Sequence, residues 1–126
     1  MENAARPLQE SFARQFGQDW VNAWNSHDLE AILAHYDDDV ELISPVALKL
    51  LHNGDGVVRG KTALGTYFLR GLQAYPELHF DLIDVLWGLE TVVVYYRNNV
   101  RQGKAAEVMQ ISATGKVRRV WANYDV

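Results

Sequence analysis

Residues 19–47, DWVNAWNSHDLEAILAHYDDDVELISPVA, decide the fold of this 126-residue chain. Aromatic residues recur at every fourth position up to Trp24, which predicts a helix with one broad apolar stripe over residues 8–25. Asp28 is a suitable N-cap for a second helix that runs to about residue 36. Residues 40–44 then read as a strand, which ends at Pro45 because proline cannot donate to a strand ladder.

The remaining chain continues this order with one more helix and four strands. Residues 48–60 contain the turn signal Asn-Gly-Asp-Gly and are expected to form a loop, and residues 61–74 are expected to form a helix. Short glycine-containing connections favour antiparallel hairpins between the four strands predicted at residues 78–87, 91–99, 104–112 and 117–124. The order α-α-β-α-β-β-β-β predicts one α+β domain over residues 1–126, in which a curved mixed sheet wraps around helices. We expect residues 1–7 to form a loose arm.

Composition excludes several classes of function. The net charge is −4 and no basic block is present, which argues against nucleic-acid binding. The chain has no cysteine, and therefore no disulfide, thiolate zinc site or cysteine nucleophile. No apolar run approaches the roughly 20 residues of a membrane span, so we expect no membrane partner and a soluble, cytoplasmic protein.

Three segments are informative together: WVNAWNSHDLEAILAHYDDDVEL (residues 20–42), RGKTAL (residues 59–64) and TGKVRRVWANYD (residues 114–125). They resemble the nuclear transport factor 2-like superfamily, and within it the SnoaL-like and ketosteroid-isomerase-like branch. The resemblance implies a cone whose open end admits a small, mostly apolar ligand. It also implies a homodimer formed through the outer face of the sheet. We expect no cofactor.

The resemblance also assigns three positions that carry chemistry in ketosteroid isomerases. Trp20 stands where those enzymes have an oxyanion-binding tyrosine, and Ser44 stands where they have the aspartate base. Glu107 falls near the third carboxyl group, which those enzymes keep protonated. An indole N–H donates a hydrogen bond but exchanges no proton near neutral pH, and a lone serine is a poor base. The classical isomerase mechanism is therefore not expected here.

Arg97 and Glu107 are the candidate catalytic residues. If residues 101–103 form a three-residue hairpin loop, Arg97 lies directly opposite Glu107 and the two side chains share a face with Tyr95 and Met109. On a concave face these residues would form an acid–base or binding site. On a convex face the pair would be an exposed salt bridge worth under about 1 kcal/mol. The resemblance to the isomerases favours the concave face.

Aromatic residues supply the other candidates for the ligand pocket. The residues expected to line it are Trp20, Trp24, Ser44, Tyr67, Tyr95, Met109 and Tyr124. Trp20 and Trp24 each bring an N–H that prefers a partner when buried, although aromatic residues at helical spacing are more often simply core. Trp121 and Tyr124 point to opposite faces of the last strand, and we expect Tyr124 to point inward.

No metal site is expected. The four histidines, at positions 27, 35, 52 and 79, lack metal-ligand spacing, and residues 27 and 52 are expected in solvated turns. Residues 37–39, Asp-Asp-Asp, are expected to end the second helix with solvated charges, because no further ligands follow at regular spacing.

Two functions from different classes remain open at this point. The first is a cofactor-independent isomerase, cyclase or dehydratase that acts by proton transfer, with Glu107 as the acid or base and Arg97 as its partner. The second is a non-catalytic module that binds a small hydrophobic molecule. Epoxide hydrolysis is a weaker third, because it needs two carboxylates around an arginine and only Glu107 is placed for it.

Overall fold

The computed structural model describes residues 8–100 and 102–125, so the predicted arm at residues 1–7 lies outside it. The helices are α1 (Glu10–Ser26), α2 (Leu29–Leu33), α3 (Pro45–Leu51) and α4 (Lys61–Ala74). The strands are β1 (Tyr36–Ile43), β2 (Val57–Arg59), β3 (Phe80–Trp87), β4 (Thr91–Asn98), β5 (Gly103–Ile111) and β6 (Val117–Tyr124). None of these helices is long and apolar enough to cross a membrane within the described residues.

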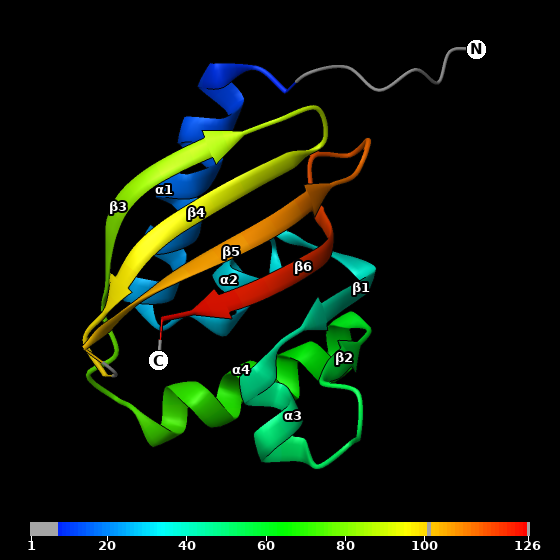
Figure 1. Ribbon diagram of the computed structural model, residues 1–126, viewed down its shortest axis with the longest axis vertical. Helices are drawn as coiled ribbons and strands as arrows, with labels where there is room; N and C mark the ends of the chain where they lie inside the picture. The colour runs from blue at the N-terminus through cyan, green and yellow to red at the C-terminus, as the bar shows by residue number, and fades with distance from the viewer. Residues whose placement is uncertain (1–7, 101, 126) are drawn as a thin grey trace.

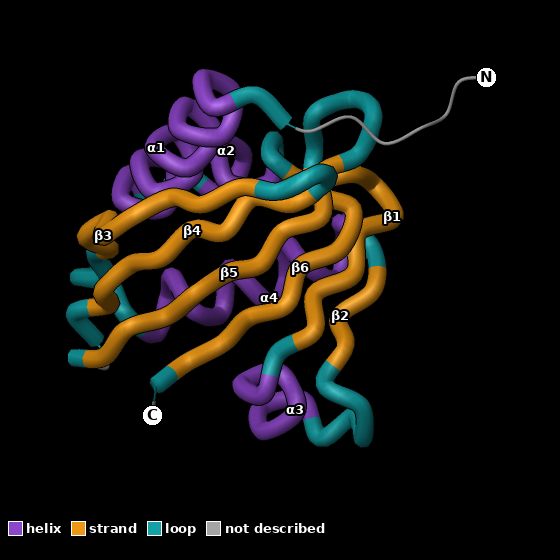
Figure 2. Tube along the Cα trace, turned by 45° about the horizontal axis from the view of Figure 1, so that its top comes forward, coloured by secondary structure: helices purple, strands orange, loops and turns teal. Residues whose placement is uncertain are grey.

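The six strands form one curved, open sheet in the order β2-β1-β6-β5-β4-β3. Neighbouring strands are antiparallel except β1 and β6, which are parallel and join the two halves of the chain. The sheet curves around α1, α2 and α4, and α3 lies at one end near β2 (Figures 1 and 2). This arrangement confirms the predicted α+β cone.

Helix α1 packs on the sheet through the predicted aromatic stripe, of which Phe16, Trp20 and Trp24 are buried. It approaches β3 closely at Gly17, where an added Cβ would lie 2.6 Å from a methyl group of Val85. The helix ends at His27, whose left-handed backbone (φ 59°) directs its N–H to the carbonyl oxygen of Trp24.

Helix α2 begins as predicted but ends early. The carboxylate of Asp28 accepts hydrogen bonds from the backbone N–H groups of Glu30 and Ala31, as expected of an N-cap. The expected extension to residue 36 is wrong, because β1 starts at Tyr36 and includes the three aspartates that were expected to stop the helix. Tyr36 and Val40 are buried while Asp38 and Asp39 are exposed, so the apolar residues at either end of the run hold it in the sheet.

Residues 48–60, expected to be a loop, contain regular structure. The Ser44 side chain accepts hydrogen bonds from the N–H groups of Val46 and Ala47, and Pro45 takes the first helical position, so α3 begins directly after β1. Strand β2 then pairs with residues 41–43 of β1. The Ser-Pro pair therefore starts a helix in addition to ending a strand.

The turn between β4 and β5 is longer than predicted. Asn98 pairs with Gly103, so the connection has four residues, 99–102, and not three. Glu107 consequently lies opposite Val94, and Arg97 lies opposite Lys104. The predicted pairing of Arg97 with Glu107 is wrong, and this register decides the chemistry inside the cone.

Candidate functional site

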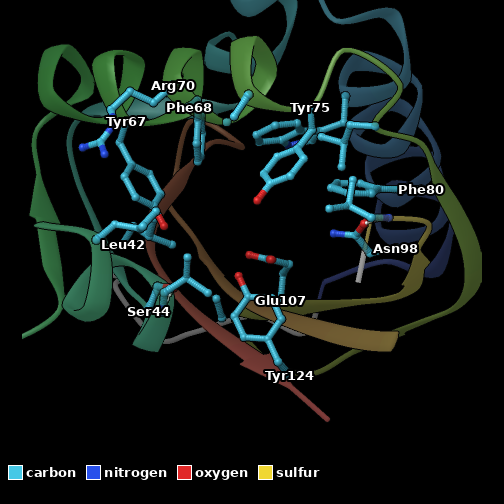
Figure 3. Close-up of a pocket in the computed structure, with 18 of the residues that line it drawn as sticks. Leu42, Ser44, Tyr67, Phe68, Arg70, Tyr75, Phe80, Asn98, Glu107 and Tyr124 are labelled. Atoms are coloured by element: carbon cyan, nitrogen blue, oxygen red, sulfur yellow. Dashed lines mark hydrogen bonds between the residues drawn. The ribbon is translucent and has the colours of Figure 1, made fainter. Parts of the chain in front are cut away.

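A cavity of about 330 Å³ occupies the inside of the cone, between the concave face of the sheet and the helices α1, α3 and α4 (Figure 3). Its deep residues are Trp20, Trp24, Tyr36, Phe68, Phe80, Tyr96 and Glu107. The exposed residues among its lining are Lys49, Leu50, Arg70, Ala74 and Tyr75, which places the mouth between α3 and the C-terminal end of α4.

The inner wall is a packed group of aromatic rings. Trp20 stacks on Phe80 with ring centroids 5.7 Å apart, and Phe80 contacts Tyr96 at 4.3 Å. Trp24 meets the ring of Phe68 edge-on at 4.7 Å. These contacts join α1, α4, β3 and β4, so they hold the cavity open and make most of its surface apolar.

Glu107 is the acidic residue of this wall. Its carboxyl group projects from β5 into the cavity (Figure 3), and the Tyr96 hydroxyl donates a hydrogen bond of 2.8 Å to its Oε2. Burial raises the pKa of Glu107 from 4.5 to about 7, while the hydrogen bond from Tyr96 partly offsets that rise. Both protonation states of Glu107 are therefore populated near neutral pH. Burial raises the pKa of Tyr96 well above 10, so this phenol stays protonated and acts as a donor.

A second buried polar group lies near Glu107. The indole N–H of Trp20 donates a 2.9 Å hydrogen bond to the hydroxyl of Tyr36, whose pKa is raised by burial and then by the charge of Glu107. The Trp24 indole N–H also lies near this hydroxyl and lowers its pKa slightly. Even so, the buried Trp24 Nε1 makes no geometrically acceptable hydrogen bond with a described residue.

Ser44 lines the cavity but its hydroxyl oxygen has a structural role. It caps α3 by accepting hydrogen bonds from Val46 N at 3.1 Å and Ala47 N at 3.4 Å. The polar atoms at the two isomerase-like positions are thus engaged within the protein, those of Ser44 by the α3 backbone and that of Trp20 by Tyr36.

Six of the predicted site residues line the cavity. They are Trp20, Trp24, Ser44, Tyr67, Glu107 and Tyr124. Tyr67 and Tyr124 point into the cavity from α4 and β6 (Figure 3), whereas Trp121, on the other face of β6, is 38% exposed. The expected orientation of the last strand is therefore correct.

The other three predicted residues lie elsewhere. Arg97 is exposed on the outer face of β4, and Tyr95 lies beside a shallow depression on that same face. Met109 shares the inner face with Glu107 but is fully buried in the core and does not line the cavity. Arg97 and Tyr95 were predicted on the wrong face because the turn starts two residues earlier and ends one residue earlier than expected. Together these differences shift β4 by three residues against β5, and an odd shift exchanges the two faces.

The cavity also contains residues that the sequence did not indicate. The same odd shift that removes Arg97 brings Tyr96 to Glu107, so the correct turn length would have identified this tyrosine. Tyr36 was hidden within the predicted helix, and Lys49 within the predicted loop. Predicting Arg70 and Tyr75 would have required the location of the cavity mouth, which the sequence does not indicate.

The histidines lie away from the cavity. His27 forms a 2.7 Å hydrogen bond with the Leu78 carbonyl oxygen, so it is not simply solvated as expected. His35 contacts the Ala31 carbonyl oxygen, His52 caps α3 and His79 is exposed beside Asp81. Within the described part of the chain, no three His, Cys, Asp or Glu residues are grouped in a way that could hold a metal ion.

Comparisons with known proteins agree with this architecture. The family model of the SnoaL-like domain matches residues 18–124. The chain is similar to a SnoaL-like protein of unknown function from Burkholderia thailandensis, with 36% identity, a TM-score of 0.93, and coverage of 96% of this chain and 100% of the other. A search of the curated proteins gave no match.

Two more distant solved structures share the fold alone. One is a "putative isomerase of the SnoaL-like family" from Agrobacterium tumefaciens, with 14% identity, a TM-score of 0.73, and coverage of 92% of this chain and 99% of the other. The other is a "putative ketosteroid isomerase" from Kribbella flavida, with 16% identity, a TM-score of 0.69, and coverage of 92% and 79%. By the family match and the shared architecture, the chain belongs to the SnoaL-like family of the nuclear transport factor 2-like superfamily.

Proposed function

We propose that the cavity binds a small, mostly apolar molecule and that Glu107 transfers a proton on it. The observation that carries this proposal is a carboxyl group with a pKa of about 7, buried in an aromatic cavity and hydrogen-bonded to Tyr96. A general acid or base is most efficient when its pKa lies near the working pH. The reaction class is a cofactor-independent isomerisation, cyclisation or dehydration.

In an isomerisation, the Glu107 carboxylate takes a proton from a carbon next to a carbonyl group. The electron pair of that C–H bond moves into the neighbouring bonds, and the same carboxyl group returns the proton at a second carbon. The Tyr96 hydroxyl supports this cycle because it donates to the carboxylate form and keeps the group oriented. The aromatic wall supplies an apolar surface for the body of the substrate.

The proposal is tested with 2-tetralone, a two-ring ketone whose α-protons exchange with solvent. We expect the wild-type protein in D₂O to accelerate this exchange, followed by proton NMR, and Glu107→Gln to abolish the acceleration. Glu107→Gln should still bind 2-tetralone, as measured by quenching of tryptophan fluorescence. Glu77→Gln, at an exposed position, is the matched control and should behave like wild type.

A non-catalytic binding function is the second candidate, and one observation favours it. Trp20 and Ser44, at the positions where ketosteroid isomerases have their other catalytic groups, use their polar atoms for Tyr36 and for the α3 backbone. Binding of 2-tetralone with exchange no faster than in buffer would favour this function over catalysis. Failure of 2-tetralone and of other neutral two-ring compounds to bind would contradict both.

We also propose that two copies of the chain pair through the outer face of the sheet. One apolar row crosses this face at matching register, formed by Leu86, Val93, Val108 and Trp121 on β3 to β6. Leu86 is 53% exposed and Trp121 is 38% exposed, so pairing would remove large apolar side chains from water. The partner is a second copy because a two-fold axis through the row would bring the same apolar surface to both sides.

A further inference from the structure

The charges around the cavity are opposite in sign to those of the whole chain. The chain has a net charge of −4, yet the charged residues that line the cavity are two cations, Lys49 and Arg70, and one acid, Glu107. Glu107 lies deep, whereas both cations are exposed and belong to the helices at the mouth. We propose that the ligand is an amphipathic carboxylate whose anionic end is held at the mouth by Lys49 and Arg70. This inference rests on the proposed ligand-binding function of the cavity.

Both cations belong to helix faces that border the cavity. On α3, Lys49 follows the cavity-lining residue Val46 by three positions, so the two lie on the same side of the helix. Leu50, the next residue, also lines the cavity. On α4, the lining residues 67, 70, 71 and 74 form one continuous stripe that contains Arg70. Figure 3 shows Arg70 on α4 above the cavity, one turn from Tyr67. The two positive charges therefore come from two different helices that border the same opening.

Neither cation is neutralised by an acid of the described chain. Ion pairs form elsewhere, at Arg14 with Glu10, at Arg59 with Asp55, and at Arg119 with Glu41. Within residues 8–100 and 102–125, Lys49 and Arg70 take part in no such pair, so both remain available to an anion. A guanidinium group binds a carboxylate through two parallel hydrogen bonds, and an ammonium group adds a point charge.

The interior determines the rest of the ligand. Behind the mouth the wall is aromatic, so the body of the ligand is apolar. A second anion at the deep end would lose its hydration among the aromatic rings and would be repelled by the ionised form of Glu107. A molecule with one anionic end, an apolar body and a neutral deep end matches the cavity along its whole length, whereas a fully apolar molecule gains nothing from the two cations.

The test uses 2-naphthoate and 2-naphthamide, which share size and shape and differ in charge. Affinities are measured by isothermal titration calorimetry at pH 6 and low salt for the wild type and for Lys49→Gln/Arg70→Gln. The control is Arg97→Gln/Arg118→Gln, which removes two exposed cations that do not line the cavity. Glu107→Gln is measured in parallel, because it reports whether the anion instead lies at the deep end.

We expect the wild type and the control to bind 2-naphthoate about tenfold more tightly than 2-naphthamide. The Lys49→Gln/Arg70→Gln protein should lose this preference and keep its affinity for 2-naphthamide. Added salt should weaken binding of 2-naphthoate alone.

Three results would overturn the inference. If the wild type binds 2-naphthamide as tightly as 2-naphthoate, the cavity binds ligands but has no anion site, and the proposed function stands. If Glu107→Gln removes the preference and the double variant at the mouth keeps it, the anion lies at the deep end. If the wild type binds neither compound, the inference and the proposed ligand-binding function both fail.

Discussion

Glu107 couples the stability of the protein to pH. Its pKa is raised by burial from 4.5 to about 7, so the folded protein binds this proton more tightly than the unfolded chain does. Stability from this group is therefore full below about pH 4.5, falls as the pH rises toward 7 and is constant above that. Glu107→Gln has no charge at this position at any pH. The difference in free energy of unfolding between this variant and wild type should therefore shift by about 3 kcal/mol in favour of the variant between pH 4.5 and pH 8.

Urea unfolding of both proteins at the two pH values measures this difference, and Glu77→Gln controls for the loss of one carboxylate from an exposed position. An equal gap between Glu107→Gln and wild type at both pH values would show that Glu107 titrates normally. The raised pKa, and with it the main support for proton transfer, would then be lost.

The two tryptophans of α1 offer a matched pair of substitutions. The Trp20 N–H donates to the Tyr36 hydroxyl, whereas the buried Trp24 N–H has no acceptable partner among the described residues. Trp20→Phe and Trp24→Phe remove the same atoms from the same helix, but only Trp20→Phe breaks a hydrogen bond. We expect Trp20→Phe to reduce the free energy of unfolding by about 1 kcal/mol more than Trp24→Phe in denaturant titrations. Equal losses would mean that the Trp20–Tyr36 hydrogen bond contributes nothing to stability.

At the scale of elements, two helical glycines test how closely the helices approach their neighbours. An added methyl group at Gly17 would lie 2.6 Å from Val85 Cγ2 and push α1 away from β3, whereas Gly71 on α4 has no atom within 4 Å of that position. Gly17→Ala should lower the free energy of unfolding by about 1 kcal/mol or more, because overpacking exceeds the gain in helix propensity. Gly71→Ala should raise it by about 0.5–1 kcal/mol. Thermal unfolding of both variants measures the contrast, and a stabilised Gly17→Ala protein would contradict the close packing of α1.

Helix α3 depends on its cap. Ser44→Ala removes the oxygen that accepts from Val46 N and Ala47 N, and should reduce the free energy of unfolding by about 1 kcal/mol. Ser44→Gly should cost only a few tenths of that amount, because glycine leaves the N–H groups open to water. Chemical unfolding of the two variants measures the difference. If alanine and glycine have the same cost, the Ser44 side chain does not act as a cap.

The elements that were predicted well are those with long, regular patterns. Helices α1 and α4 and the last four strands lie within a few residues of their predicted positions, since apolar periodicity specifies them directly. Helix α3 and strand β2 have seven and three residues, too few for a periodic signal. Their presence depends on the Ser44 cap and on pairing with β1, and only the cap is visible in the sequence.

The site was predicted less completely, and for a different reason. Trp20 was placed through the helical stripe and through the resemblance to the family, which tolerate small errors in position. Arg97 was predicted on the inner face in place of Tyr96 because the predicted register of β4 against β5 was wrong by three residues. The turn length is not encoded by strand periodicity. Because that periodicity has a repeat of two, an odd error in register places every side chain of the strand on the opposite face.

For the whole molecule, the proposed pairing through the outer face makes a direct prediction. Trp121→Glu and Leu86→Glu each place a charge in the apolar row, so both variants should sediment as monomers in analytical ultracentrifugation while the wild type sediments as a dimer. Leu89→Glu adds the same charge at a side chain that is 60% exposed in the β3–β4 turn, outside the row, and should leave the dimer intact. A wild-type protein that is monomeric throughout the concentration range would exclude the pairing.

The place of β6 in the sheet has a consequence for how the chain folds during synthesis. This last strand lies between β1 and β5, so the early strands β1 and β2 reach the rest of the sheet only through residues 117–124. While the ribosome still holds those residues, the edge of β1 that β6 will cover is without its partner and is exposed to association with other nascent chains. The cone is therefore complete only once β6 has entered the gap between β1 and β5 and joined the two halves of the molecule.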